Sequence, residues 1–263
     1  MDYVFLLELL KSAAAGAFLA VLGFCDYKSR SLPDKLVYSY LGFSAAAFTA
    51  SLFLALEKYP HGLCITYVAF SALILPAFFY STYRAGLVGD GDVFVSLSVG
   101  LSYAFPLSYA TTIPRSGLLP PALVITLYSV LASLVAVLAQ ALVVFAKYKS
   151  LVRSLPGVYK VLVPLLAKPI KLGDYVEGRA KHFYPVQCFE KTSSGVVVKY
   201  RVGVRLNSGC SVELAEAAGL TREDYIWASP GQPLVFYMLL GFVAYVLLGD
   251  APVLYLLTRL LGS

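Results

Sequence analysis

The chain has 263 residues, of which 59% are hydrophobic and only 14% are charged. An ordinary soluble domain carries about 25% charged residues, so this composition excludes a simple soluble protein. Several apolar runs have the roughly 20 residues that a helix needs to cross about 30 Å of hydrocarbon. The sequence therefore predicts an all-α polytopic membrane protein, with a small soluble domain inserted before its last transmembrane helix. The start, Met1-Asp2-Tyr3, lacks the basic region of a cleavable signal peptide.

The apolar runs predict six membrane spans. The first contains Glu8 and Lys11, which lie three residues apart on one helix face and are expected to pair. The third contains Pro76, which predicts a kink. The fifth opens with Pro120 and Pro121, and proline is well tolerated at a helix start. The spans are predicted at residues 4–25, 36–56, 61–81, 91–110, 120–146 and 232–258.

The segment 147–230 has a different composition. Its part at 150–170 is apolar but interrupted by prolines, and we expect it to lie along the membrane interface or to form a short re-entrant piece. Residues 196–206 alternate apolar and polar side chains, which predicts a strand with one buried face, paired with a strand over 183–190. A short helix ending at Gly219 follows. We expect three parts: residues 1–146 with five spans, 147–230 with the interfacial segment and a small α+β domain, and 231–263 with the last span.

Basic residues concentrate in alternate connecting segments. Three segments carry them: 26–35 has Lys28, Arg30 and Lys35, the segment near 81–90 has Arg84, and the long segment opens with Lys147, Lys149 and Arg153. The opposite loops hold only Lys58 and Arg115. The positive-inside rule then places the three basic segments in the cytoplasm and both termini outside. It also explains the net charge of +6 without a nucleic-acid partner.

Two aspartates are predicted to meet at one face of the bilayer. Asp26 ends the first span, and Asp92 closes the tetrapeptide at 89–92, two crossings later. A carboxyl group beside hydrocarbon is costly and is by default a functional-site hypothesis. Two carboxyl groups that meet share a proton, so that one activates water and the other protonates a carbonyl oxygen. The spacing therefore predicts an aspartyl protease dyad of Asp26 and Asp92, in which the sequence does not assign acid and base.

The residues around the dyad have alternative readings. Gly89 and Gly91 are expected to provide backbone conformations closed to other residues and to let a substrate strand approach closely. Asp90 is the alternative partner of Asp26 if the turn directs it inward. Asp34, after Pro33, either caps the second span or attracts a basic segment of the substrate.

The sequence predicts no metal site and no other cofactor. The four cysteines form no C-x-x-C pair, no H-E-x-x-H motif is present, and the predicted topology separates His61 from His182. Cys188 and Cys210 lie in the polar region and could be neighbours. If that region is cytoplasmic, the expectation is free thiols.

Three stretches resemble the archaeal preflagellin (archaellin) and type IV prepilin peptidases, membrane aspartyl proteases of the GxGD class. They are Asp26-Tyr27-Lys28-Ser29-Arg30-Ser31-Leu32-Pro33-Asp34, Gly89-Asp90-Gly91-Asp92 and Trp227-Ala228-Ser229-Pro230-Gly231-Gln232-Pro233. The resemblance implies catalysis by Asp26 and Asp92. It also implies removal of a short basic leader from membrane-embedded precursors with class III signal peptides. Cleavage would occur at the cytoplasmic face of the cell membrane, before the subunit joins a pilus or archaellum.

Other functions compete with this interpretation. Presenilin-like intramembrane proteases share GxGD, but they pair it with a Tyr-Asp inside a span, whereas Cys25 precedes Asp26 here. A transporter or channel would use Asp26 and Asp92 as ion sites, and should show repeats in matched halves, which the sequence lacks. A structural partner of a secretion machine is the last alternative.

Overall fold

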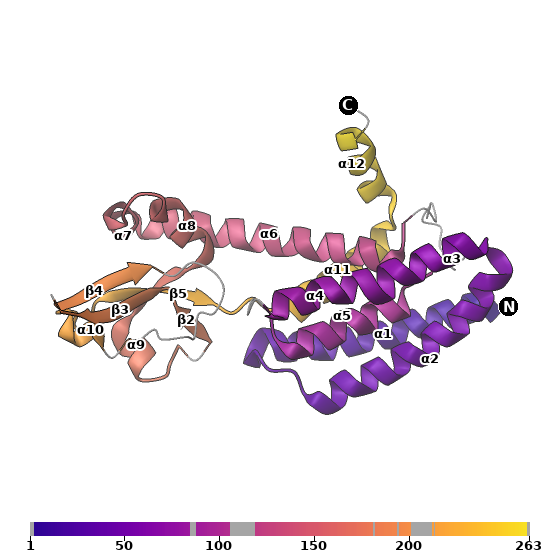
Figure 1. Ribbon diagram of the computed structural model, residues 1–263, viewed down its shortest axis with the longest axis horizontal. Helices are drawn as coiled ribbons and strands as arrows, with labels where there is room; N and C mark the ends of the chain where they lie inside the picture. The colour runs from indigo at the N-terminus through magenta and orange to yellow at the C-terminus, as the bar shows by residue number, and fades with distance from the viewer. Residues whose placement is uncertain are drawn as a thin grey trace. The chain divides into compact units, whose positions relative to one another are not determined.

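A computed structural model describes residues 3–84, 88–105, 119–180, 182–193, 195–200, 212 and 214–261. The chain divides into two compact units, the first comprising Met1–Arg84, Val88–Ser133 and Pro233–Ser263, and the second comprising Ala85–Leu87 and Leu134–Gln232. The boundary at Ser133 falls inside a long helix, α6 (Pro121–Lys147). The first unit is helical, and the second contains all the described strands (Figure 1). The three-part division of the sequence at residues 146 and 230 stays a prediction.

The first unit is built from helices on both sides of the long insertion. They are α1 (Tyr3–Ser29), α2 (Asp34–Lys58), α3 (His61–Val68), the π-helical segment η1 (Ala69–Ile74), α4 (Leu75–Arg84), α5 (Asp90–Ser102), the first half of α6, α11 (Leu234–Leu248) and α12 (Ala251–Leu261). Four described helices are long and apolar enough to cross a membrane: α1, α2, the run His61–Arg84 and α6. The bent pair α11–α12 would make a fifth. The prediction of a mostly helical chain with several candidate spans is confirmed, and the count of six stays a prediction.

Two predicted spans differ from the structure. The helix expected over 91–110 ends at Ser102 after 13 residues, and 106–118 lie outside the described residues. The span expected over 232–258 is broken, because α11 and α12 are bent by 94° at a short break between them. Gly249 lies at this break with φ of +68°, a conformation that glycine adopts without the steric cost of a side chain. One glycine inside an apolar run therefore changes the direction of the chain.

The third predicted span contains a π-helical segment. η1 ends two residues before Pro76, whose ring removes an N–H donor from the helical ladder. The carbonyl of Ser71 in η1 lies directly against Gly100 of α5, where an added Cβ would be only 2.1 Å from the oxygen. The segment therefore brings two helices into backbone contact. The kink at Pro76 stays a prediction.

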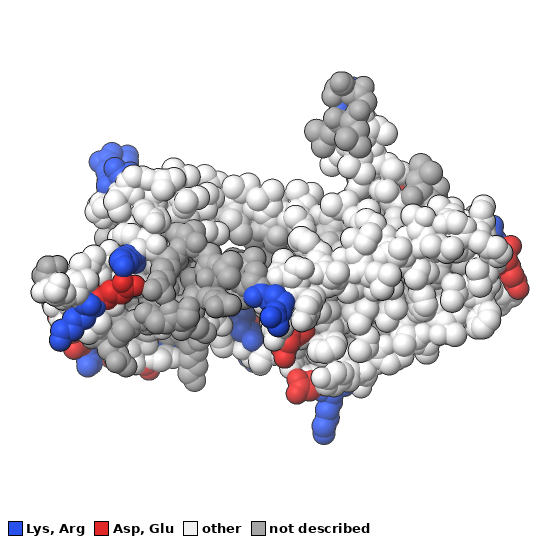
Figure 2. All heavy atoms as spheres, in the orientation of Figure 1, with Lys and Arg blue, Asp and Glu red and all other residues white. Residues whose placement is uncertain are grey.

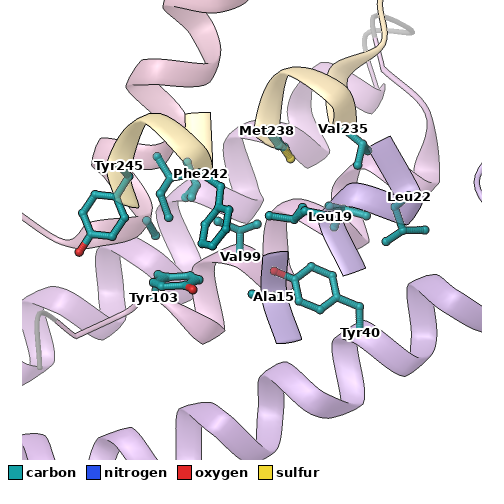
Figure 3. Packing of buried hydrophobic residues seen from close by; sticks show 14 of the residues in the cluster. Ala15, Leu19, Leu22, Tyr40, Val99, Tyr103, Val235, Met238, Phe242 and Tyr245 are labelled. Carbon is teal, nitrogen blue, oxygen red and sulfur yellow. The ribbon is translucent and has the colours of Figure 1, made fainter. Parts of the chain in front are cut away.

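The core of the first unit joins α1, α2, α5 and α11 (Figure 3). Within it α1 packs most extensively on α11, and α2 on α5. The ring of Tyr103 lies 5.7 Å from that of Phe242 and 6.2 Å from that of Tyr245, centroid to centroid. Large apolar side chains also point outward, as at Phe53 and Ile65, which are 67% and 69% exposed. The outer surface over α2 and α4 is mostly uncharged between its ends (Figure 2), as lipid contact requires.

The first helix contains a buried ion pair. Lys11 pairs with Glu8, as predicted, and Lys11 is only 1% exposed. Its Nζ lies 5.3 Å from the centroid of the Tyr103 ring, and the Tyr103 hydroxyl bonds to that of Ser12 at 3.3 Å. A charge inside a membrane protein is tolerated when it is paired within the protein. These contacts join α1 to the end of α5.

The second unit contains two small sheets. Its elements are the end of α6, α7 (Lys149–Ser154), α8 (Tyr159–Leu166), β1 (Lys168–Lys171), α9 (Leu172–Val176), β2 (Phe183–Pro185), β3 (Gln187–Thr192), β4 (Gly195–Tyr200), α10 (Leu214–Ala217) and β5 (Tyr225–Pro230). Strand β5 lies between β1 and β2 in an antiparallel sheet, and β3 pairs with β4 in a hairpin. Ile226 of β5 and Phe189 of β3 are buried in one core cluster. The stretch around Trp227, one of the three that carry the family resemblance, is thus a central strand.

The hairpin agrees with the predicted pair of strands where it is described. β4 covers residues 195–200, while 201–206 of the predicted strand lie outside the described residues. Gly195 has φ of +121°, and the Thr192 hydroxyl donates to its carbonyl at 2.8 Å, which closes the turn. Cys188 on β3 is fully buried and disulfide-bonded, so the expectation of a free thiol there is wrong. Cys210 lies outside the described residues.

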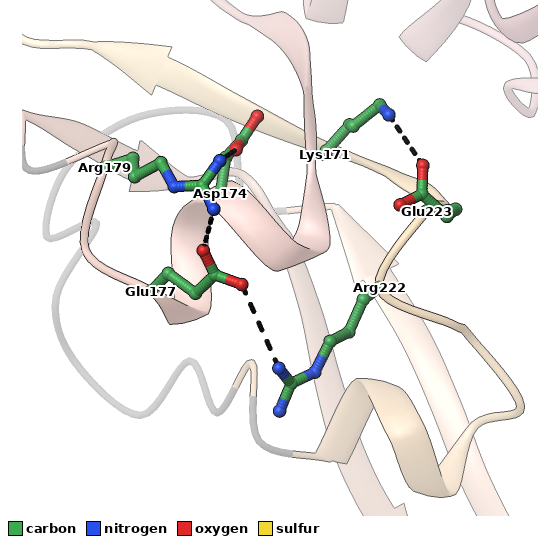
Figure 4. Close-up of polar contacts among 6 residues, drawn as sticks. All are labelled: Lys171, Asp174, Glu177, Arg179, Arg222 and Glu223. Carbon is green, nitrogen blue, oxygen red and sulfur yellow. Dashed lines mark hydrogen bonds and ion pairs between the residues drawn. The ribbon is translucent and has the colours of Figure 1, made fainter.

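A chain of exposed ion pairs surrounds α9 (Figure 4). Arg179 binds both Asp174 and Glu177, and Arg222 lies 3.9 Å from Glu177. Lys171 binds Glu223 at 2.6 Å. Exposed pairs of this kind contribute only about 0–1 kcal/mol each. We infer that the buried cluster around Phe189 and Ile226, rather than these exposed ion pairs, determines the fold of the second unit.

Candidate active site

Asp26 lies in the last turn of α1 and is 7% exposed. Its Oδ2 accepts hydrogen bonds from the backbone N–H groups of Val235 at 2.8 Å and Phe236 at 3.4 Å. Both donors belong to the first turn of α11, where the helix leaves N–H groups without partners of its own. A helix N-terminus also carries partial positive charge, so these donors favour the ionised carboxylate. Nothing in the sequence around Asp26 indicated this partner, 209 residues away.

A glycine one turn earlier allows α11 to come this close. An added Cβ on Gly23 would lie 3.2 Å from the Cα of Phe236 and 3.4 Å from the carbonyl oxygen of Val235. Both neighbours are backbone atoms and have little freedom to move aside. Tyr27 packs its ring on that of Phe236 at 5.1 Å. Gly23 is therefore a site residue that the sequence analysis missed, and its place one turn before Asp26 was the available signal.

Asp92 lies in the first turn of α5 and is half-buried. Its Oδ2 accepts the backbone N–H of Gly89 at 2.8 Å, which is the half of a capping box that a glycine N-cap allows. Asp90 is exposed, and its Oδ1 accepts the N–H of the neighbouring Gly91 at 2.8 Å. The tetrapeptide is thus a helix start in which Asp92, rather than Asp90, is held towards the protein.

Neither glycine of the tetrapeptide has a backbone conformation that only glycine can adopt, and Gly91 alone lies in a tight space. Gly89 has φ of −80°, open to any residue, and Gly91 is not among the described residues with positive φ. The expectation of a special backbone conformation is therefore wrong. An added Cβ on Gly91 would lie 2.8 Å from Cδ1 of Leu32. This contact packs the loop after Asp26 against the start of α5, and so brings together the two motifs that carry the aspartates.

The structure brings Asp26 and Asp92 towards each other. Their carboxyl groups lie close enough to interact electrostatically. Among the described residues, no direct hydrogen bond joins them. Asp26 is held by α11 and Asp92 by its own helix start, so neither carboxyl group depends on the other for its position. The arrangement suits a pair of acids that act on a molecule placed between them.

Two further residues accompany Asp26. Arg30 ends α1 in a left-handed conformation, with φ of +52° and its N–H on the carbonyl of Asp26 at 3.1 Å. Its guanidinium interacts electrostatically with Asp26 and with the buried Tyr237. The Nη1 of Arg30 is buried and has no hydrogen-bond partner among the described residues. From the sequence, Arg30 was expected only to mark the cytoplasmic side of the membrane.

Asp34 does not form the predicted cap. The N-cap of α2 is Pro33, and no side chain bonds to the first turn of the helix. Asp34 is the first residue of α2 and is exposed, where a carboxylate still interacts favourably with the helix dipole. Its carboxylate is therefore accessible from solvent. Among the described residues, no group of three or more His, Cys, Asp or Glu side chains is arranged to hold a metal ion.

Two family models match the chain. Residues 13–144 match the type IV leader peptidase family, and residues 159–251 match the archaeal peptidase A24 C-terminus type II. The first match contains both aspartates and covers half of the chain, and the second covers most of the second unit and reaches through α11. A comparison with individual curated proteins gave no match.

Proposed function

The chain belongs to the type IV leader peptidase family, and from this premise we propose that it is a membrane aspartyl endopeptidase. It would remove the short basic leader from prepilin-like precursors, including preflagellins, at the cytoplasmic face of the membrane. Membrane localisation follows from the apolar helices and the family. The cytoplasmic orientation of the site rests on the distribution of basic residues.

One observation carries the proposal: two carboxyl groups from different helices lie close enough to interact electrostatically, while each accepts hydrogen bonds from its own backbone donors. Two acids in this relation can hydrolyse a peptide without a metal. One takes a proton from water as the oxygen attacks the carbonyl carbon, and the other donates a proton to the carbonyl oxygen. The tetrahedral intermediate then breaks its C–N bond, and the amine leaves with a proton.

The surroundings favour one assignment of roles. Asp26 accepts two backbone N–H groups at a helix N-terminus, and donors of this kind stabilise the ionised form of a carboxyl group. Asp92 accepts one N–H group and interacts with the carboxylates of Asp26 and Asp90. Neighbouring negative charge favours the protonated form of Asp92. We therefore assign Asp26 as the base that activates water and Asp92 as the acid.

A direct assay tests the proposed function. The purified full chain, in nanodiscs, is given a precursor with a basic leader, a small residue at the cleavage point and a following apolar helix. We expect one cut at the leader junction, detected by mass spectrometry of both products. We also expect the rate to be unchanged by a metal chelator, because the carboxylates supply the acid and the base. Absence of cleavage, with ion flux through the same protein reconstituted in sealed vesicles, would favour the transporter instead.

We expect Asp34 to affect binding of the leader rather than the chemical step. Its exposed carboxylate lies eight residues after Asp26 and can attract a basic leader. Asp34→Asn should raise KM for a leader with lysine or arginine severalfold and leave kcat unchanged, since an exposed ion pair contributes only about 0–1 kcal/mol. The matched measurement uses a leader with neutral residues, for which the variant and the native protein should have the same KM. A lower kcat with unchanged KM would contradict this role.

A further inference from the structure

Helix α8 in the second unit is apolar on two sides, and only one side is covered. Its inner side contributes Val163 to a cluster with the end of α6, α7 and β5. Its outer side presents apolar residues spaced as one helical face, namely Val158, Val161, Leu162 and Leu166, which are 64%, 56%, 37% and 41% exposed. A helix with this much apolar surface is usually buried on both sides. We therefore expect the outer face of α8 to be covered by another apolar surface.

The charges in the stretch of chain that contains α8 are all of one sign. Residues 147–173 contain six lysines and arginines and no acidic residue. The exposed members are Lys147, Lys149, Arg153, Lys160 and Lys168. Basic side chains gather over α7 in Figure 2. An apolar face bordered by basic residues is the pattern of a helix that lies in the interface of a membrane with anionic lipids.

The position of α8 in the chain places it near a membrane surface. It follows α6, whose 27 residues have the highest mean hydropathy of the candidate spans. At 1.5 Å per residue this helix is about 40 Å long, which exceeds the roughly 30 Å of hydrocarbon. Val144 in the last turns of α6 packs with Val152 of α7 and Val163 of α8. The short helices therefore fold back on α6 where it would leave the bilayer.

We propose that the outer face of α8 docks onto the surface of the membrane that α6 crosses. Its apolar side chains would lie among the acyl chains, and the neighbouring lysines and arginine at anionic headgroups. The occupant is lipid rather than a second copy of the chain, because two such faces would bring their basic residues together. This docking would attach the second unit to the bilayer. It depends on the insertion of α6 and not on the peptidase activity.

Fluorescence quenching by brominated anionic lipid tests the docking. The full chain carries Val161→Trp and is placed in nanodiscs that hold one chain each, with the native protein as the background for Trp227. The matched control is Val197→Trp, on the exposed surface of β4 in the same unit. We expect the Val161→Trp variant to lose fluorescence in brominated lipid and to emit at shorter wavelength. The fraction of fluorescence that the Val197→Trp variant loses in brominated lipid should be no greater than that of the native protein.

Several outcomes would overturn the proposal. Quenching of the Val161→Trp variant that is no greater than the native background would show that α8 is not in lipid. A shift of the emission to shorter wavelength that is present only in nanodiscs with two chains would identify a second copy as the occupant. Equal quenching in anionic and neutral lipid would contradict the role of the basic residues. If the Val161→Trp variant does not fold, Val158→Trp probes the same face and carries the same expectation.

Discussion

Asp26→Asn and Asp92→Asn are each expected to lower kcat for leader cleavage by about 10²–10⁴-fold, the contribution of a positioned acid or base. Asparagine keeps the size of the side chain and an oxygen that can accept the N–H groups of Val235 or Gly89. The local fold should therefore survive, and thermal melting of the purified variants should change little. Rates are measured in nanodiscs with the precursor assay described above, at saturating substrate, so that the loss is assigned to chemistry.

Asp90→Asn is the matched control for these two variants. Asp90 lies in the same helical turn as Asp92, but it is exposed and bonds only to the N–H of Gly91. We expect this variant to keep most of the native rate. Full activity of Asp92→Asn together with loss of activity in Asp90→Asn would make Asp90 the partner of Asp26. Full activity of both Asp26→Asn and Asp92→Asn would exclude the aspartyl mechanism.

The pairing of the two motifs followed from counting membrane crossings. Asp26 and Asp92 were separated by two apolar runs, and two crossings return the chain to the same side. The contact between Gly91 and Leu32 agrees with this reasoning, because it joins the motifs in space. Hydropathy was sufficient to predict that the two motifs lie close together, because a long apolar segment in a bilayer has few alternatives to a membrane-crossing helix.

The partner of Asp26 was not predictable in the same way. Backbone N–H groups have no residue signature, so the sequence cannot show that the first turn of α11 donates to a carboxylate. The break at Gly249 was hidden for a related reason: one residue with positive φ lies where the chain bends by 94°, and it does not change the mean hydropathy around it. Strand β5 was missed because its pairing with β1 and β2 is non-local, and strand propensity depends strongly on such context.

Gly241→Ala is expected to destabilise the first unit by about 1–3 kcal/mol, the usual effect of overpacking. Gly241 lies on α11 against α6, and an added Cβ would be 2.1 Å from the hydroxyl of Ser129 and 2.4 Å from the carbonyl oxygen of Ile125. The helices would have to separate, as expected where a small residue permits close packing in a membrane. Because α11 also donates to Asp26, activity should fall with stability. Thermal melting and the cleavage assay in nanodiscs measure both effects.

Gly42→Ala provides the control with the opposite sign. Gly42 is exposed within α2, and nothing lies within 4 Å of an added Cβ. Alanine is better than glycine in a helix by up to about 1 kcal/mol, so this variant should be as stable as the native protein or more so. Adding Ser129→Ala to Gly241→Ala should restore only part of the loss, because the backbone oxygen of Ile125 remains. Full recovery in that double variant would show that the hydroxyl alone sets the spacing of α6 and α11, whereas an unchanged melting temperature for Gly241→Ala would refute the close contact itself.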